Sequence, residues 1–258
     1  MGSTIRRDVD AARGIATLTL DRPERRNALN AELVADLSAA FREFEADAAI
    51  RVIALRGAGP DFCAGADLQE VRDSVDEGVL ENLANARALG DLFLAMRWLG
   101  KPIVAVVHGR ALAGGCGLAT ACDLVVASAS ASFGYPEVRI GFVPAMVMAI
   151  LRRSMGETRA FELVALGRTI DAATAADYGM VNRVWPDAGF DDAAAEFLAD
   201  LSGASASAVA LTKRLLYQID GADFAAAIGA GADVNALARL TDDCRDGIDR
   251  FLNRKKED

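Results

Sequence analysis

The stretch Ile103–Ala127, IVAVVHGRALAGGCGLATACDLVVA, indicates the fold more clearly than any other part of the chain. It begins with five apolar residues, which is typical of a strand buried on both faces, and it ends with the similarly apolar Asp123–Ala127. Between them lies Gly109–Leu118, a glycine-rich turn that leads into an apolar helical segment. A strand, a turn, a helix and a second strand in this order predict a largely parallel sheet.

Further strand and helix signals precede this stretch. Gly14–Leu20 has the composition of a strand, and Pro23 ends it because proline fixes φ. Asn30 is placed to cap an amphipathic helix whose apolar residues recur at helical spacing. Residues 51–56 then predict another strand, and residues 79–99 a long helix.

The C-terminal quarter has a different pattern. Val181–Trp185 is the last strand candidate, and alanine-rich amphipathic segments follow it. We therefore predict two parts, a core over residues 1–187 and a helical region over residues 188–258. The helices expected in the second part cover approximately residues 190–201, 205–218, 222–237 and 241–253.

Composition excludes several classes of protein. A chain of 258 residues that is 52% hydrophobic can bury a large core. The net charge of −9 argues against a nucleic-acid partner, since such binding needs Lys and Arg to neutralise phosphates. Four cysteines without CxxC spacing and a single histidine predict neither a disulfide scaffold nor a metal site. With no secretory signal or membrane-spanning run, we expect a cytoplasmic location.

Two glycine-rich turns, Cys63–Asp67 and Ala113–Gly117, carry the first chemical signal. Gly65 permits a tight backbone that can aim the amide of Ala66 outward. The amide of Gly114 would lie at a helix N-terminus, where peptide dipoles favour negative charge. The two amides together could hold the oxygen of an acyl group, whereas either segment alone could be only a tight turn.

Glu137 carries the second signal. It lies in ASFGYPEVRIGFVP, residues 131–144, where aromatic and aliphatic residues surround it. A carboxylate in apolar surroundings has a pKa raised towards neutral, which suits a general acid and base. The alternative is a loop glutamate paired with Arg139.

In this order the segments resemble the enoyl-CoA hydratase/isomerase (crotonase) superfamily. The resemblance implies an α/β crotonase-like spiral of ββα turns that forms two roughly perpendicular sheets. It also implies a C-terminal helical trimerisation region, in a homotrimer or a dimer of trimers. The segments that carry it are LDRPERRNALN (20–30), FCAGADL (62–68), AGGCGLATACDLVVA (113–127), FGYPEVRIGFVP (133–144) and ADYGMVNRV (176–184).

The resemblance also implies site residues. Carried over by position, the amides that hold the thioester oxygen belong to Ala66 and Gly114, and Glu137 is the acid and base. Coenzyme A enters as part of an acyl-CoA substrate, with no tightly bound cofactor, and the chain end often closes over it in a neighbouring subunit. The residues expected to line the substrate are Arg25, Arg26, Ala28, Ala64, Asp67, Leu68, Phe251 and Lys255, with Arg25 or Arg26 meeting the phosphates.

The chain departs from the family pattern at one position. Hydratases of the family commonly use two glutamates, and the earlier of the two falls on Gly117. Hydration of a 2-enoyl-CoA through Glu137 is the leading prediction. Double-bond isomerisation with one carboxylate as proton shuttle stays open, as do thioester hydrolysis, decarboxylation and a non-catalytic acyl-CoA-binding role.

Other reactive side chains are given structural roles. His108, the only histidine, is expected to be structural or to line a pocket. Cys63 and Cys116 are expected to be small packing residues, although a position in the first turn of a helix would lower the pKa of Cys116. Asp123 is expected to cap or brace the strand that follows the glycine-rich helix.

Overall fold

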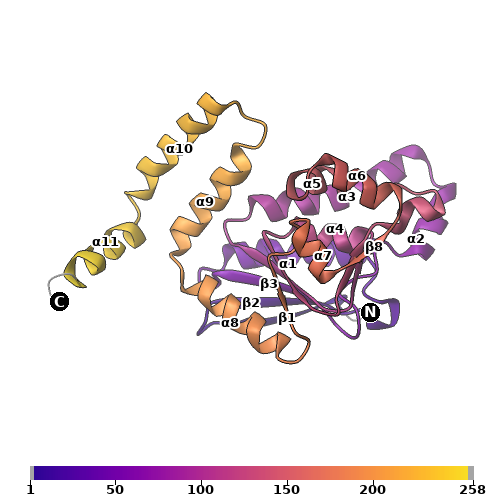
Figure 1. Cartoon of the computed structure of the whole chain (residues 1–258), viewed down its shortest axis with the longest axis horizontal. Coiled ribbons are helices and arrows are strands. Elements are labelled where there is room, and N and C mark those ends of the chain that lie inside the picture. The colour runs from indigo at the N-terminus through magenta and orange to yellow at the C-terminus, as the bar shows by residue number, and fades with distance from the viewer. Residues whose placement is uncertain (1–2, 255–258) are drawn as a thin grey trace.

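A six-stranded sheet forms the centre of the molecule (Figure 1). In the computed structural model, which describes residues 3–254, the first two strands pair antiparallel and the others pair parallel. The prediction of a largely parallel sheet is therefore confirmed. In spatial order the strands are β1 (Ile5–Asp10), β2 (Ile15–Leu20), β3 (Val52–Gly57), β4 (Ile103–Val107), β6 (Leu124–Ser128) and β9 (Arg183–Trp185).

A second, three-stranded sheet consists of β5 (Arg110–Leu112), β7 (Ser132–Gly134) and β8 (Thr169–Asp171), in that order. Each of its strands has three residues, which is too short to show a period. Local patterns also missed β1, because only Ile5 of this edge strand is buried. Its pairing with β2 sets it in the sheet, with Ile5 opposite Leu20.

Helices cover both faces of the large sheet. Asn30 caps α1 (Ala31–Ala46) as predicted, since its side chain accepts a 3.0 Å hydrogen bond from the amide of Leu33. With α1, the helices α3 (Val79–Trp98) and α4 (Gly114–Ala121) contribute to the main core. On the other face α8 (Phe190–Gly203) packs through residues such as Phe190 and Leu198. The remaining core helices are α2 (Leu68–Asp73), α5 (Met148–Ser154), α6 (Glu157–Ala165) and α7 (Ala172–Asp177).

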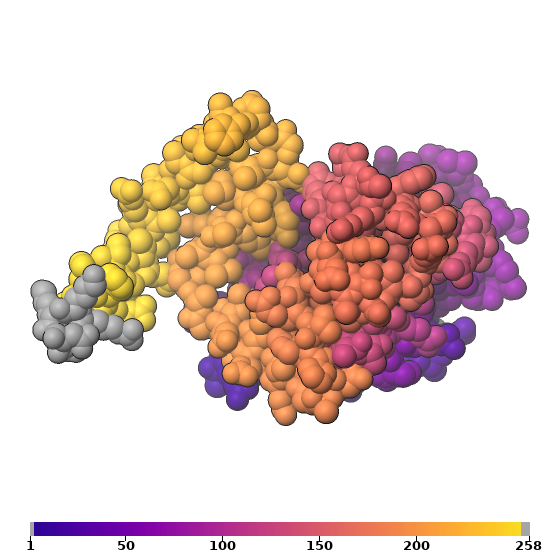
Figure 2. Space-filling view, viewed as in Figure 1, coloured from indigo at the N-terminus to yellow at the C-terminus, as the bar shows by residue number. Residues whose placement is uncertain are grey.

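The last three helices form an arm that starts against the core and extends away from it (Figures 1 and 2). These are α9 (Ala206–Gln218), α10 (Phe224–Ala238) and α11 (Asp242–Arg254), as the alanine-rich pattern predicts. No residue of α10 is buried among the residues described. Within residues 3–254, none of the helices has the length and apolarity that crossing a membrane requires.

One buried cation fastens α9 to the core. Lys213 is 6% exposed, and its Nζ donates to the carbonyls of Met96 and Lys101 and to Oδ2 of Asp123, at 2.7 to 2.9 Å. Asp123 also accepts 2.7 Å and 2.8 Å hydrogen bonds from the amide of Ile103 and the hydroxyl of Tyr217. Asp123 therefore braces the start of β4 as well as α9, which is more than the strand-capping role expected from sequence.

Candidate active site

The first glycine-rich turn follows β3 and packs directly against the second. Gly65 has φ +106°, and a Cβ atom there would lie 2.6 Å from Cβ of Ala113. Glycine avoids both the backbone strain and this overlap. Gly115 makes a similar close approach, since a Cβ atom there would overlap the carbonyl oxygen of Cys63. The two turns, some fifty residues apart in sequence, are thus in contact.

The second turn contains an unusual backbone conformation. Ala113 has φ +50° and ψ −129°, which is strained for a residue with a Cβ atom. A 2.8 Å hydrogen bond from its amide to the carbonyl of Gly134 holds it in β5–β7 register. This conformation ends the short strand β5 and starts α4 at Gly114.

The two turns leave two amides together. The amide of Leu29 donates to Gly65 and the amide of Asp67 donates to Leu29, at 2.7 Å and 2.8 Å, so the amide of Ala66 lies on the opposite side of this strand-like segment. A Cβ atom at Gly114 would lie 3.8 Å from the amide nitrogen of Ala66. Neither the amide of Ala66 nor that of Gly114 donates to an acceptor within the part of the chain described. Two unpaired amide donors this close together are the arrangement that binding of an oxyanion requires.

Glu137 lies in the short 3₁₀ helix Pro136–Ile140, which directly follows β7. The residue is 9% exposed, and its Oε2 is buried and finds no partner among residues 3–254. Desolvation by burial raises the pKa of this carboxyl group above its usual value. Among the described residues Glu137 forms no ion pair with Arg139, so it is a buried glutamate and not the paired loop glutamate of the alternative.

The loop before α1 presents two arginines. Arg25 and Arg26 are exposed, and neither makes an ion pair within the described residues. The loop itself is held by Asn27, which is fully buried and donates 2.8 Å hydrogen bonds to the carbonyls of Ala58 and Asp61. Asn27 was missed from sequence, because its partners lie more than thirty residues away.

The same loop contacts the first glycine-rich turn. The amide of Ala64 donates to the carbonyl of Arg26 at 3.0 Å. Ala28 is 9% exposed, and its carbonyl accepts a hydrogen bond from the guanidinium group of Arg22. The structure thus brings the loop that carries Arg25, Arg26 and Ala28 into contact with the first glycine-rich turn at Ala64.

Asp67 and Leu68 lie at the start of α2. Asp67 caps this helix and forms a 3.0 Å ion pair with Arg22, both side chains being largely buried. Burial opposes ionisation of Asp67, but hydrogen bonds from Arg22 and from the amide of Gln69 outweigh it and lower the pKa. Asp67 is therefore a brace between the two loops. Leu68 is 60% exposed beside it.

The C-terminal candidates lie apart from this site. Phe251 is in α11, which Figure 1 shows at the far end of the molecule from α4. Its side chain is 63% exposed. Lys255 lies outside the described residues. Within one chain, the structure does not bring Phe251 to the glycine-rich turns.

The cysteines and the histidine near the site have structural environments. Cys63 and Cys116 are fully buried, and desolvation raises the pKa of each thiol to about 12. The expectation that the helix terminus lowers the pKa of Cys116 is therefore wrong, because burial outweighs the helix dipole. His108 Nε2 lies 2.8 Å from the carbonyl oxygen of Gly59.

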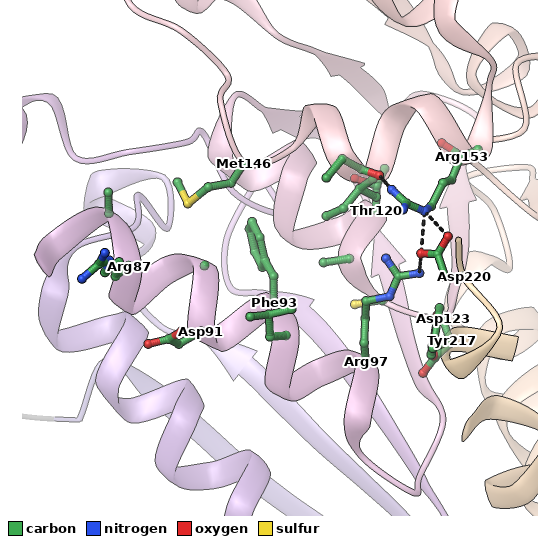
Figure 3. A pocket seen from close by; sticks show the side chains of 18 of the residues that line it. Arg87, Asp91, Phe93, Arg97, Thr120, Asp123, Met146, Arg153, Tyr217 and Asp220 are labelled. Atoms are coloured by element: carbon green, nitrogen blue, oxygen red, sulfur yellow. Dashed lines mark hydrogen bonds and ion pairs between the residues drawn. The ribbon is translucent and has the colours of Figure 1, made fainter. Parts of the chain in front are cut away.

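A separate cavity of about 860 Å³ opens between α3, α5 and α9 (Figure 3). Apolar side chains such as Phe93 and Met146 line its middle, and Arg87 and Asp91 lie at one end. At the other end Arg97 and Arg153 converge on Asp220, at 3.4 Å and 2.6 Å. Sequence patterns did not predict this cavity, because it is formed by segments more than one hundred residues apart.

The chain combines an α/β fold, two neighbouring backbone amides without an acceptor among the described residues, and a buried glutamate after β7, and these features define its class of protein. The family profile described as Enoyl-CoA hydratase/isomerase matches residues 10–258. The chain belongs to the enoyl-CoA hydratase/isomerase (crotonase) superfamily.

Individual relatives are consistent with this assignment. A relative from Thermus thermophilus, itself only inferred to be an enoyl-CoA hydratase, is 38% identical over 241 residues, or 93% of this chain and 95% of its own. A mevalonyl-coenzyme A hydratase of Beauveria bassiana is 37% identical over 206 residues, covering 77% of this chain and 74% of its own. The crystal structure of an enoyl-CoA hydratase from Mycobacterium smegmatis superposes with a TM-score of 0.93 and 31% identity, covering 98% and 97% of the two chains.

Proposed function

We propose that this protein adds water to a 2-enoyl-CoA, with Glu137 as acid and base and the amides of Ala66 and Gly114 as donors to the thioester oxygen. The observation that carries the proposal is the buried, unpartnered Oε2 of Glu137 with its raised pKa. A general acid and base works best when its pKa lies near the working pH. The names of the relatives support an acyl-CoA reaction of this kind.

The proposed reaction assigns one step to each of these groups. The thioester oxygen accepts hydrogen bonds from the amides of Ala66 and Gly114, which draws electrons from the conjugated double bond. The carboxylate of Glu137 takes a proton from water as the water oxygen forms a bond to C3. The resulting enolate is stabilised at its oxygen by the two amides. Glu137 then returns its proton to C2, so one water is added and the enzyme is restored.

The coenzyme A portion is proposed to lie along the loop before α1. Arg25 and Arg26 would meet its phosphates, and Ala28, Ala64, Asp67 and Leu68 would line its path. Because Phe251 lies far from this path within one chain, its contact with substrate requires a neighbouring subunit in a homotrimer or a dimer of trimers. The exposed apolar side chains of α10 and α11 support such an assembly, and we extend the proposal to Lys255.

Isomerisation is the second candidate. Gly117 leaves α4 without a carboxyl group, and a single carboxylate can move a proton from C2 to C4. Assaying crotonyl-CoA and a 3-enoyl-CoA in deuterium oxide separates the two reactions. Hydration places deuterium at C2 together with a new hydroxyl group at C3, whereas isomerisation places no hydroxyl group.

Glu137→Gln tests the catalytic assignment. We expect the rate with the active substrate to fall about 10²–10⁴-fold, the usual contribution of a positioned acid and base. Glu43→Gln is the matched control, because Glu43 is an exposed glutamate near the C-terminal end of α1, away from the loop that contacts the turns. A Glu137→Gln variant as active as this control would overturn the assignment. Failure of the wild-type protein to hydrate any enoyl-CoA would overturn the proposed reaction.

A further inference from the structure

The space beside Gly117 is already filled. Gly117 lies one helical turn after Gly114, so both face the same side of α4. A Cβ atom at position 117 would overlap Cγ1 of Val147, and it would lie 3.5 Å from Cβ of Val147 and 3.6 Å from Cζ of Phe93. The Cβ atom of a glutamate at position 117 would therefore already clash with Val147.

Val147 has little freedom to move aside. It is 4% exposed and belongs to the main core. Its carbonyl accepts hydrogen bonds from the amides of Ile150 and Leu151, at 3.0 Å and 2.9 Å, which fixes the backbone at the start of α5. Its branched side chain is also restricted in χ1 at such a position.

Phe93 closes the space from the other side. It comes from α3, is 6% exposed, and lines the separate cavity shown in Figure 3. Gly117 therefore faces an apolar wall that Val147 and Phe93 form. The three atoms that would lie nearest to a Cβ at position 117 are all carbon atoms of Val147 and Phe93.

We propose that Val147, supported by Phe93, is a specificity-determining residue that keeps this a one-carboxylate site. It occupies the volume that a second acid on α4 would need. It thereby presents an apolar surface to the acyl group where a two-carboxylate site presents charge. This inference rests on the proposed function, in which the acyl group lies beside α4.

A double-mutant cycle measures the steric part without any activity assay. Gly117→Glu is expected to lower Tm by about 5 °C, since overpacking a core is destabilising. Val147→Ala is also expected to lower Tm, because it leaves a cavity. The pair Gly117→Glu/Val147→Ala should have a higher Tm than Gly117→Glu alone. Additive losses would overturn the proposal, as would a Gly117→Glu variant as stable as the wild-type protein.

The catalytic part is tested in a Glu137→Gln background. There Gly117→Glu/Val147→Ala is expected to regain at least about tenfold in hydration rate over Glu137→Gln alone, because a new carboxylate occupies the cleared volume. Gly117→Gln/Val147→Ala is the matched control, with the same shape and no carboxyl group. Equal rates for the two would overturn the proposal. If the wild-type protein hydrates no enoyl-CoA, the proposed function fails while the Tm cycle still decides the role of Val147.

Discussion

The glycine-rich turns and the C-terminal helices differ in how far contacts within one chain fix their structure. At the turns, Gly65, Gly115 and Ala113 are held by close backbone approaches and by hydrogen bonds from other elements. In α10 nothing described is buried, and side chains such as Phe224 and Ile228 are 84% and 60% exposed. Contacts within one chain thus fix the backbone of the turns, while the last helices leave large apolar side chains exposed.

The largest expected effect concerns Glu137, which is buried in the core and not in the exposed C-terminal helices. Because its folded-state pKa is raised, activity that needs its carboxylate should fall as pH drops through a value above the usual glutamate range. The rate of hydration against pH measures this. An acid limb at the ordinary carboxyl pKa would contradict it.

The same pKa has the opposite consequence for stability. The native state binds more protons than the unfolded state between the unfolded pKa and the raised folded pKa, so stability from this group falls as pH rises through that window. Glu137→Gln should therefore raise Tm at neutral pH while it removes activity. Glu43→Gln is again the control, and equal Tm values for the two variants would argue against buried charge at Glu137.

Two glycine substitutions compare the regions directly. Gly65→Ala should cost about 2–4 kcal/mol, since it adds overlap with Ala113 to an unfavourable φ. Gly229→Ala in α10, where no described atom beyond the backbone of its own helix lies within 4 Å of the new carbon, should stabilise the helix by about 0.5–1 kcal/mol. Thermal unfolding measures both. Shifts of the same sign would remove the distinction between the two regions.

The exposed face of α10 gives the next prediction. Ile228→Asp should dissociate the proposed trimer, because it places a charge in an apolar contact. Light scattering on the eluted protein gives the mass. Asp233→Asn, in the same helix, is the control and should leave the mass unchanged. A wild-type protein that is monomeric at assay concentration would show that α10 has another partner.

The smallest expected effect is at the loop before α1. Arg26→Ala should raise KM for an acyl-CoA about tenfold, the order expected for one hydrogen bond to a charged group, with kcat little changed. Arg42→Ala, an exposed arginine on α1, is the control. The corresponding acyl-pantetheine, which lacks the nucleotide phosphates, should not distinguish Arg26→Ala from wild type. A tenfold loss with that shortened substrate would place Arg26 elsewhere.

The elements that could be predicted from the sequence are those whose signals lie within a few consecutive residues. Asn30 lies next to the amide it caps, and the apolar residues of β4 follow one another, so both were predicted correctly. Strand β1 was missed because its partner β2, and not its own burial, keeps it in the sheet. Glu137 could be predicted from its apolar neighbours, and burial does raise its pKa.

Other parts of the site depend on contacts between distant segments. The Arg22–Asp67 ion pair joins residues 45 positions apart. The close approach of Val147, at the start of α5, to Gly117 of α4 is likewise a contact between separate helices. Cys116 shows the converse case, where a correct local rule about helix termini gave a wrong pKa because burial by distant segments was larger. These contacts and this pKa are set by tertiary packing, so no local sequence pattern indicates them.

The hydrogen bonds and the ion pair of Lys213 limit how C-terminal helices can be exchanged between relatives in chimeras. Lys213 belongs to α9, yet its Nζ contacts Asp123, directly after the helix that begins at Gly114. A chimera joined between residues 203 and 206 would inherit the ammonium group from one parent and its carboxylate from the other. Where the donor of the C-terminal helices lacks a lysine here, Asp123 would be left as a buried charge without its cation. Exchange of C-terminal helices between relatives should therefore succeed only when this pair is transferred together.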